Sequence, residues 1–64
     1  MRMADKLYNV YAWHYGFPER LVAKEVSFTE AMTLQDRYLK KPNWDAYVIR
    51  CEEDFNYYPE KLSR

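Results

Sequence analysis

The sequence predicts a small α+β domain in which one helix covers one face of a three-stranded sheet. Two runs of strand-forming residues precede a helix-start signal at Ser27-Phe28-Thr29-Glu30, and a third run follows it, so the order is β-β-α-β. With 64 residues the chain is long enough for one domain only. We assign residues 1–64 to that domain, with 53–64 as a C-terminal tail that either folds back or stays free.

The first predicted strand spans residues 7–15, where apolar and β-forming side chains fill both alternating registers. This pattern is typical of a central strand. Gly16 and Pro18 then mark a short turn, because glycine adopts turn conformations and proline cannot donate to a sheet ladder. Residues 20–26 alternate more clearly and carry charges, which favours an edge strand.

The helix is predicted over residues 28–40. Ser27 can accept a hydrogen bond from the amide of Glu30 while the Glu30 carboxylate reaches back to the amide of Ser27, which forms a capping box. The following Lys40 and Lys41 suit the negative end of the helix dipole, and Pro42 prevents continuation. The side expected to face the sheet consists of Phe28, Ala31, Gln35, Tyr38 and Leu39, flanked by Met32 and Leu34.

After a predicted loop over residues 42–45, residues 46–51 form the third strand. We expect Tyr47, Ile49 and Cys51 to share one face of it and to meet the helix. A right-handed crossover makes this strand parallel to the second strand, with the first strand between them and antiparallel to both. The expected strand order is therefore 2-1-3, and the sheet face opposite the helix is left open.

The open face of the first strand is predicted from side-chain size. The register that narrows at Ala12 suits close approach by a helix, whereas Tyr11, Trp13 and Tyr15 are bulky and have polar tips. We therefore expect these three rings to form an exposed row, which usually marks an interface. The expected flanking residues are Val48 and Arg50 on one side and Leu21 or Val22 on the other.

The C-terminal segment offers two alternatives. Glu52, Glu53 and Asp54 form an acidic cluster, and the aromatic stretch 55–58 follows it. If the segment folds back over the sheet, its aromatic residues bury Trp13 and the row becomes core. In either case the acidic cluster is a solvated run or a group that meets a basic groove on another protein.

Charge and hydropathy exclude several classes of protein. Lys plus Arg equals Asp plus Glu at ten each, so no bulk positive field favours nucleic acid. A local basic and aromatic patch would need Arg37, Lys40, Lys41, Arg50 and Trp44. No run approaches the roughly 18 apolar residues of a membrane span, and residues 1–6 are too short and polar for a secretory leader. We expect a cytoplasmic protein.

No catalytic or metal motif is evident in the sequence. His14 and Cys51 could lie near each other on adjacent strands and form a nucleophile pair, but no orienting third group or oxyanion-forming glycine loop accompanies them. They fall short of a zinc set, and the acidic cluster lacks the spaced oxygen ligands of a calcium loop. We expect no enzyme activity, no metal and no cofactor.

Three segments carry a resemblance to a known class of protein. Residues 26–32, 34–39 and 44–51 resemble segments of many very small bacteriophage accessory proteins. In element order and size, the chain also resembles phage-encoded inhibitors of host RNA polymerase and of uracil-DNA glycosylase. The resemblance implies an inhibitor or modulator that docks on a host protein, such as a nucleic-acid-processing enzyme, in the host cytoplasm.

The residues themselves predict a non-enzymatic binding module. Rigid Tyr and Trp side chains would supply buried area, with charged groups for orientation and steering. The predicted partner-binding residues are Tyr11, Trp13, Tyr15, Arg50, Glu52, Glu53 and Asp54. The alternative hypotheses are a homodimer that pairs two open faces or two edge strands, and a weak single-stranded nucleic-acid binder.

Overall fold

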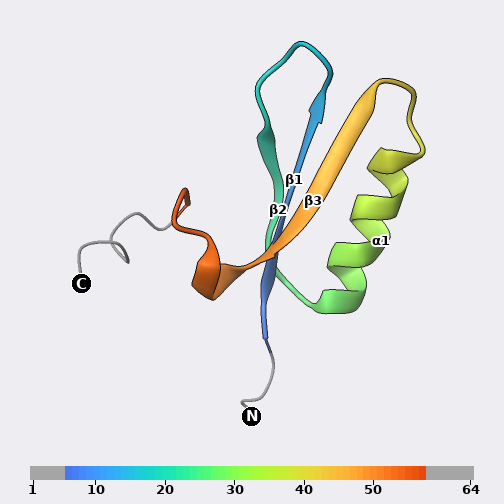
Figure 1. Cartoon of the computed structure of the whole chain (residues 1–64). Coiled ribbons are helices and arrows are strands. Elements are labelled where there is room, and N and C mark those ends of the chain that lie inside the picture. Colours follow the sequence, from blue (N-terminus) through green and yellow to red (C-terminus); the bar gives the residue numbers. More distant parts are fainter. Residues whose placement is uncertain (1–5, 58–64) are drawn as a thin grey trace.

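The computed structural model describes residues 6–57 and has the predicted α+β architecture (Figure 1). Its elements are β1 (Tyr8–His14), β2 (Arg20–Val26), α1 (Phe28–Leu39), β3 (Trp44–Arg50) and the 3₁₀ turn η1 (Cys51–Glu53). The strand order is β2-β1-β3, and β1 is antiparallel to both neighbours. The predicted order is therefore confirmed, and α1 packs on one face of the sheet.

The boundaries of α1 agree with the prediction to within one residue. Ser27 Oγ accepts a hydrogen bond from the amide of Glu30 at 3.2 Å, which confirms the Ser27 half of the predicted capping box. At the other end the amide of Lys40 donates to the carbonyl of Asp36 at 3.2 Å and closes the last turn.

The predicted loop before β3 is too long, because β3 begins at Trp44. The amide of Tyr15 donates to the carbonyl of Asn43 at 2.8 Å and extends the ladder between β1 and β3. Asn43 itself has φ 68, in a left-handed region that asparagine tolerates better than most residues. The turn is therefore tight, and the strand starts as soon as it is complete.

The faces of β1 are as predicted, but those of β3 are reversed. In the register Val48 lies opposite Val10 and Tyr47 lies opposite Tyr11, and opposed residues share a face. Tyr47 therefore lies on the open face, and so does Ile49, which is opposite Asn9. The predictions that Tyr47, Ile49 and Cys51 meet the helix, and that Val48 and Arg50 flank the open-face row, are wrong.

Three alanines explain the observed facing of β3. Ala12 and Ala31 are fully buried and Ala46, opposite Ala12, is 7% exposed. Small side chains at these positions let α1 approach β1 and β3 closely, whereas Tyr47 in the same position would hold it away. Both alternating sets of side chains in β3 are apolar, so the sequence pattern alone could not show which set faces α1.

The core is thin. Within residues 6–57 the buried hydrophobic residues are Val10, Tyr11, Ala12, Ala31 and Ala46. Several large apolar side chains remain exposed along α1: Met32, and also Phe28 and Leu39, for which the prediction that they face the sheet is wrong over about half of their surface. The described fold therefore leaves considerable apolar surface outside its own core.

The two edge strands differ in regularity. Pairing between β1 and β2 shifts register twice, and Glu25 in β2 has φ 55. Such bulges twist a strand edge and discourage further pairing. The pairing between β1 and β3 runs without a shift from Tyr8 opposite Arg50 to His14 opposite Trp44. The outer edge of β3 is therefore the regular one.

Candidate functional site on the open face of the sheet

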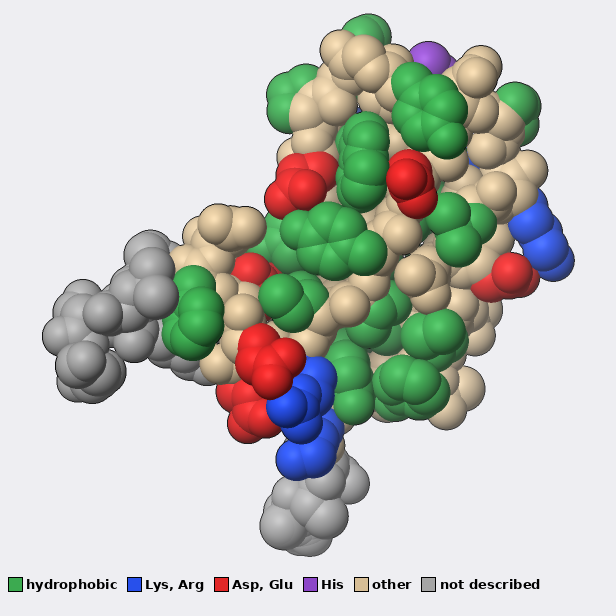
Figure 2. Space-filling view, viewed as in Figure 1, with side chains coloured by type: hydrophobic (Ala, Val, Ile, Leu, Met, Phe, Trp, Pro, Cys, Tyr) green, Lys and Arg blue, Asp and Glu red, His purple; other side chains and the backbone are tan. Residues whose placement is uncertain are grey.

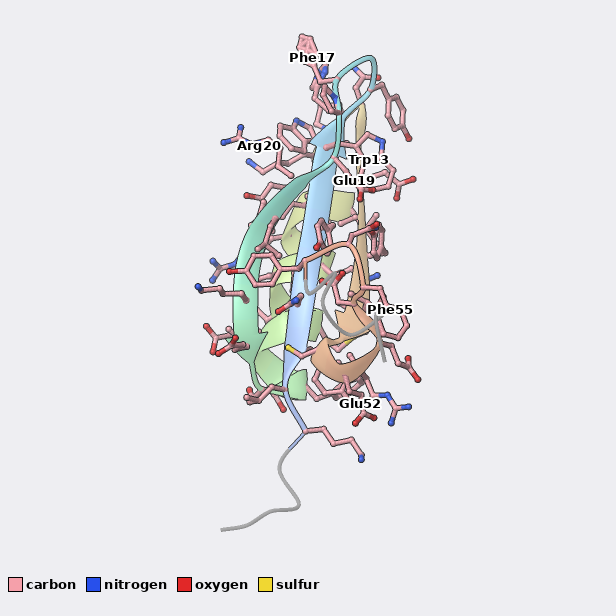
Figure 3. All side chains as sticks on the ribbon, turned by 90° about the vertical axis from the view of Figure 1, so that its left-hand side faces the viewer. Trp13, Phe17, Glu19, Arg20, Glu52 and Phe55 are labelled. Atoms are coloured by element: carbon pink, nitrogen blue, oxygen red, sulfur yellow. The ribbon has the colours of Figure 1, made fainter. Side chains whose placement is uncertain are left out.

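The open face is divided between its two ends (Figure 3). There η1 and the residues that follow it lie over one end, whereas Trp13 and Glu19 lie toward the other. We call Asn9, Tyr11 and Asp54 the latched end, because a buried carboxylate holds the C-terminal segment there. We call Trp13, Tyr15 and Tyr47 the aromatic end.

Asp54 is the centre of the latched end and is only 1% exposed. Its Oδ2 accepts hydrogen bonds from Asn9 Nδ2 at 2.7 Å and from the Tyr11 hydroxyl at 2.8 Å. Its Oδ1 accepts a further bond from the amide of Tyr57 at 3.3 Å. The carboxylate thus joins the C-terminal segment to β1 through several donors.

Asn9, which is fully buried, connects three segments through its side chain. Besides donating to Asp54, its Oδ1 accepts from the amide of Glu25 at 2.9 Å and from Cys51 Sγ at 3.1 Å. The bond to Glu25 satisfies a backbone group that the bulge in β2 displaces from the ladder. Asn9 therefore stabilises the bulge and η1 together.

Hydrogen bonding sets the charge state of this cluster. Burial by itself would raise the pKa of Asp54, but the hydrogen bonds from Asn9, Tyr11 and the amides of Tyr57 and Asn56 outweigh it and lower that pKa. Burial, followed by the hydrogen bond to Asp54, raises the pKa of Tyr11. At neutral pH Asp54 is therefore a carboxylate and Tyr11 is a neutral phenol, so the hydrogen bond between them is retained.

The prediction of a three-ring exposed row is wrong for Tyr11. This residue is 6% exposed, because Asp54 bonds to its hydroxyl and the ring of Tyr47 stacks on it with centroids 5.2 Å apart. The fold-back alternative is correct in part, with the acidic residue as the cover. Phe55 and Tyr57 are 40% and 36% exposed, and Tyr58 lies outside the described residues.

The aromatic end is built on Trp13 and Tyr47. Trp13 is half-buried, and its ring meets that of Tyr47 edge-on with centroids 6.0 Å apart. The Tyr47 hydroxyl donates to Glu19 Oε2 at 3.0 Å; burial, followed by this bond, raises the pKa of Tyr47 to about 12. Asp45 lies opposite Trp13 in the register. Two carboxylates therefore border the rings.

Tyr15 extends the aromatic end at the turn between β1 and β2 and is 56% exposed. Phe17 is 61% exposed but lies toward the other side of the sheet, because its ring is 5.7 Å from that of His14, which shares the helix-facing register of Ala12 and contacts Trp44. Gly16 between them has φ 90, a conformation that glycine adopts without strain. The amide of Phe17 donates to the carbonyl of His14 at 2.9 Å, so the two exposed rings project from a closed turn.

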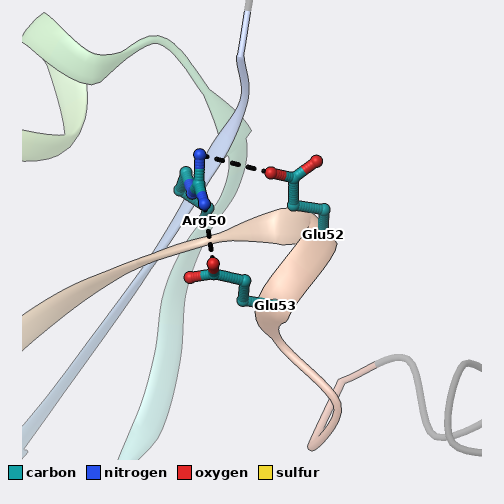
Figure 4. Close-up of polar contacts among 3 residues, drawn as sticks. All are labelled: Arg50, Glu52 and Glu53. Atoms are coloured by element: carbon teal, nitrogen blue, oxygen red, sulfur yellow. Dashed lines mark hydrogen bonds and ion pairs between the residues drawn. The ribbon is translucent and has the colours of Figure 1, made fainter.

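The predicted charged residues do not join this end. Arg50 pairs with Glu53 at 2.6 Å and with Glu52 at 3.3 Å (Figure 4). The hydrogen bond and charge of Arg50 lower the pKa of Glu53. Because Asp54 is buried, the acidic cluster is not one surface feature. Arg50 lies opposite Tyr8, at the far end of β1 from Trp13.

The other chemical candidates are also separated. His14 lies opposite Trp44, whereas the amide of Cys51 bonds to the carbonyl of Leu7, so the two residues lie at opposite ends of the sheet. The ring of Trp44 packs between His14 and Tyr38 at 5.6 and 5.3 Å, far along β3 from Arg50. Lys41 Nζ lies 5.8 Å from the centroid of Tyr38, so Lys41 and Trp44 meet the same ring. The basic and aromatic patch of the nucleic-acid alternative is therefore assembled only in part, without Arg50.

The described residues meet neither the requirements of a metal cluster nor those of a membrane-spanning helix. Over residues 6–57 there is no group of three or more His, Cys, Asp or Glu side chains suited to a metal ion. No helix within that range is long and apolar enough to cross a bilayer.

Sequence reasoning missed Tyr47, Asn9 and Glu19 as members of the open face. Asn9 carried the clearest signal, since a polar residue in the middle of a predicted central strand needs a hydrogen-bonding partner when buried. Comparisons with known proteins add no further assignment: no family model matches the chain, and no curated protein or solved structure matches it either.

Proposed function

We propose that this chain is a non-enzymatic protein-binding module that docks on another protein through its aromatic end. The observation that carries the proposal is the contact between Trp13 and Tyr47 on a sheet face that the described C-terminal segment covers only at its other end. Aromatic rings of this kind supply large contact area at low entropic cost, and they are enriched in the centres of protein interfaces.

The charges around the rings indicate the chemistry of the partner. Glu19 and Asp45 border Trp13 and Tyr47, so a complementary surface would carry Lys or Arg around an apolar centre. The same two carboxylates would repel phosphates, which disfavours the alternative of single-stranded nucleic acid. The resemblance to phage inhibitors supports a host protein as partner, with the module occluding part of its surface.

Site-specific photo-cross-linking in bacterial cells tests the proposal. A photoreactive benzoylphenylalanine would replace either Tyr15, in the aromatic end, or Phe55, an exposed phenylalanine near the latched end. We expect position 15 to yield a discrete adduct with one bacterial protein and position 55 to yield none. An identical adduct from both positions, or no adduct from position 15, would contradict the proposal.

A matched pair of substitutions then measures the contribution of the rings. Once the cross-linked protein is identified, Tyr15→Ser is expected to weaken its binding about tenfold, which corresponds to the loss of one moderate interface contact. The same change at Phe55 is expected to leave the affinity unchanged. Both side chains are exposed, so neither substitution removes core packing.

A further inference from the structure

A second uncovered surface lies on the opposite side of the sheet from the aromatic end. Phe28, Met32 and Leu39 are 55%, 40% and 47% exposed along α1. With 3.6 residues per turn, these three side chains fall within about 40° of one another around the helix axis. The buried Ala31 lies about 80° away on the side that faces the sheet. The three side chains, which we call the helix stripe, form one continuous apolar flank.

The helix stripe faces the same direction as the outer edge of β3. In Figure 1 the chain of α1 runs upward and the sheet lies to its left. Because the helix is right-handed, residues that lie about 80° further around its axis than the buried Ala31 face the viewer. The strand nearest the viewer is β3. Figure 2, drawn from the same direction, shows hydrophobic side chains over α1 and continuing onto β3.

The outer edge of β3 presents backbone groups beside this stripe. The amide of Cys51 donates to Leu7 and that of Tyr15 to Asn43, so the odd-numbered residues between them bond to β1. The backbone groups of Ala46, Val48 and Arg50 therefore point away from β1. The amide of Ala46 already donates to Asp45 Oδ1 at 2.8 Å, so another strand would meet the carbonyl of Ala46 and the backbone groups of Val48 and Arg50. Unlike β2, this edge has no register shift to discourage another strand.

We propose that the occupant of this surface is a second copy of the chain, with the two β3 strands paired antiparallel across a two-fold axis near Tyr47. The sheet would continue through six strands, and both α1 helices would lie on the same face. The pairing uses the outer backbone of β3 and the helix stripe, whereas the aromatic end uses side chains on the opposite face of the sheet, including that of Tyr47, so this proposal does not depend on the proposed function.

Strand and helix spacing support this occupant. Paired strands lie about 4.8 Å apart, and α1 packs mainly over β3 and β1 and little over β2. Two-fold symmetry through the β3 edges then sets the two helix axes about 10 to 14 Å apart. The axes of helices in contact are commonly about 8 to 10 Å apart. Large side chains such as those of the helix stripe fill the additional space when the axes are somewhat further apart. The two helix stripes would therefore meet.

The stripe is complementary to itself under the same rotation. Phe28 lies at the Arg50 end of β3, since its ring contacts Tyr8 at 5.2 Å and Tyr8 is opposite Arg50. Leu39 follows Tyr38, whose ring contacts Trp44 at the other end of β3. Reversal by the two-fold axis therefore brings Phe28 of each copy to Leu39 of the other, with Met32 near the centre.

Charges at the ends of β3 are also complementary. Lys40 and Lys41 precede β3, and Lys40 pairs with Asp36; Glu52 and Glu53 follow β3, and both pair with Arg50. The first end therefore keeps an excess of positive charge and the second an excess of negative charge, and the antiparallel pair places each beside the opposite end of the other copy. The chain has a formal net charge of +0, so two copies do not repel each other as a whole.

The test is sedimentation of the full chain over a wide concentration range. The wild type should approach about twice the chain mass of 7.9 kDa. Met32→Glu should weaken association about a hundredfold, because each dimer loses two buried apolar side chains. Thr33→Glu adds the same charge at an exposed neighbouring position and should leave association unchanged.

Cross-linking of single cysteines fixes the geometry. With Cys51→Ser as background, Met32→Cys should be joined to its own copy by a short thiol cross-linker, whereas Thr33→Cys should not. A mass of 7.9 kDa at all concentrations would overturn the proposal. So would a dimer that Met32→Glu leaves intact, or one that Tyr15→Ser dissociates, because that dimer would use the aromatic end.

Discussion

The two ends of the open face are stabilised in opposite ways. At the latched end a carboxylate is buried and aromatic side chains of the C-terminal segment stay exposed, whereas at the aromatic end apolar rings remain accessible beside carboxylates. Burying Asp54 is tolerable because Asn9, Tyr11 and backbone amides satisfy it. The comparison shows that this chain closes one end of its sheet with polar bonds and leaves the other for a partner.

Breaking the latch should have the largest effect on folding. Asp54→Ala leaves the side-chain amide of Asn9 and the hydroxyl of Tyr11 buried without their acceptor, which should lower the free energy of unfolding by about 2 to 3 kcal/mol. Urea denaturation measures this loss. Glu52→Ala, at the neighbouring exposed carboxylate, is the control; equal losses for the two variants would show that the latch contributes nothing.

The same carboxylate should make stability depend on acid pH. The folded state lowers the pKa of Asp54 below its unfolded value of about 3.9, so its stabilisation is present above that value. It is lost as the pH falls toward the folded pKa. The unfolding midpoint of the wild type should therefore drop between about pH 5 and 3, and Asp54→Asn should flatten this dependence. Glu53→Gln, which removes an exposed carboxylate, should flatten it much less.

The phenols should act at the alkaline limit. The folded state raises the pKa of Tyr11, and it raises that of Tyr47 to about 12, so both contribute stability that is full below the unfolded value of about 10. That contribution is lost as the pH rises further. Tyr47→Phe should lower the free energy of unfolding at neutral pH by no more than about 1 kcal/mol and should reduce the alkaline loss. An alkaline profile unchanged by Tyr47→Phe would contradict this role.

The smallest effect on folding is expected at the aromatic end itself. Tyr15→Ser removes an exposed ring and should change the free energy of unfolding by about 0.5 kcal/mol or less. Thermal unfolding checks this directly. A large destabilisation would mean that the rings serve the fold of the monomer, which would remove the distinction between the two ends.

Local signals predicted the elements of the fold well. The Ser27 cap, the stop at Pro42 and the glycine-containing turn are short-range chemistry, and the strand order follows from connection handedness. The facing of β3 was not predictable from alternation, because Tyr47 and Val48 are both apolar enough to be buried. Only the alanines that α1 approaches decide between them.

The site was harder to predict because its contacts join distant residues. Asp54 bonds to Asn9 and Tyr11, which are more than forty positions away in the sequence. One member of the predicted acidic surface cluster is therefore a buried anchor. The predicted row survives at Trp13 and Tyr15, with Tyr47 in place of Tyr11. Composition indicated that aromatic residues matter here, but only the register shows which of them remain accessible.

The most direct test of the central claim is the accessibility of Trp13 in the isolated chain. In a Trp44→Phe variant, Trp13 is the only tryptophan, and its fluorescence can be quenched with acrylamide. We predict ready quenching in the free chain and protection when the cross-linked partner is bound. Strong shielding of Trp13 in the free monomer would show that the chain seals its own aromatic end, and it would contradict the account.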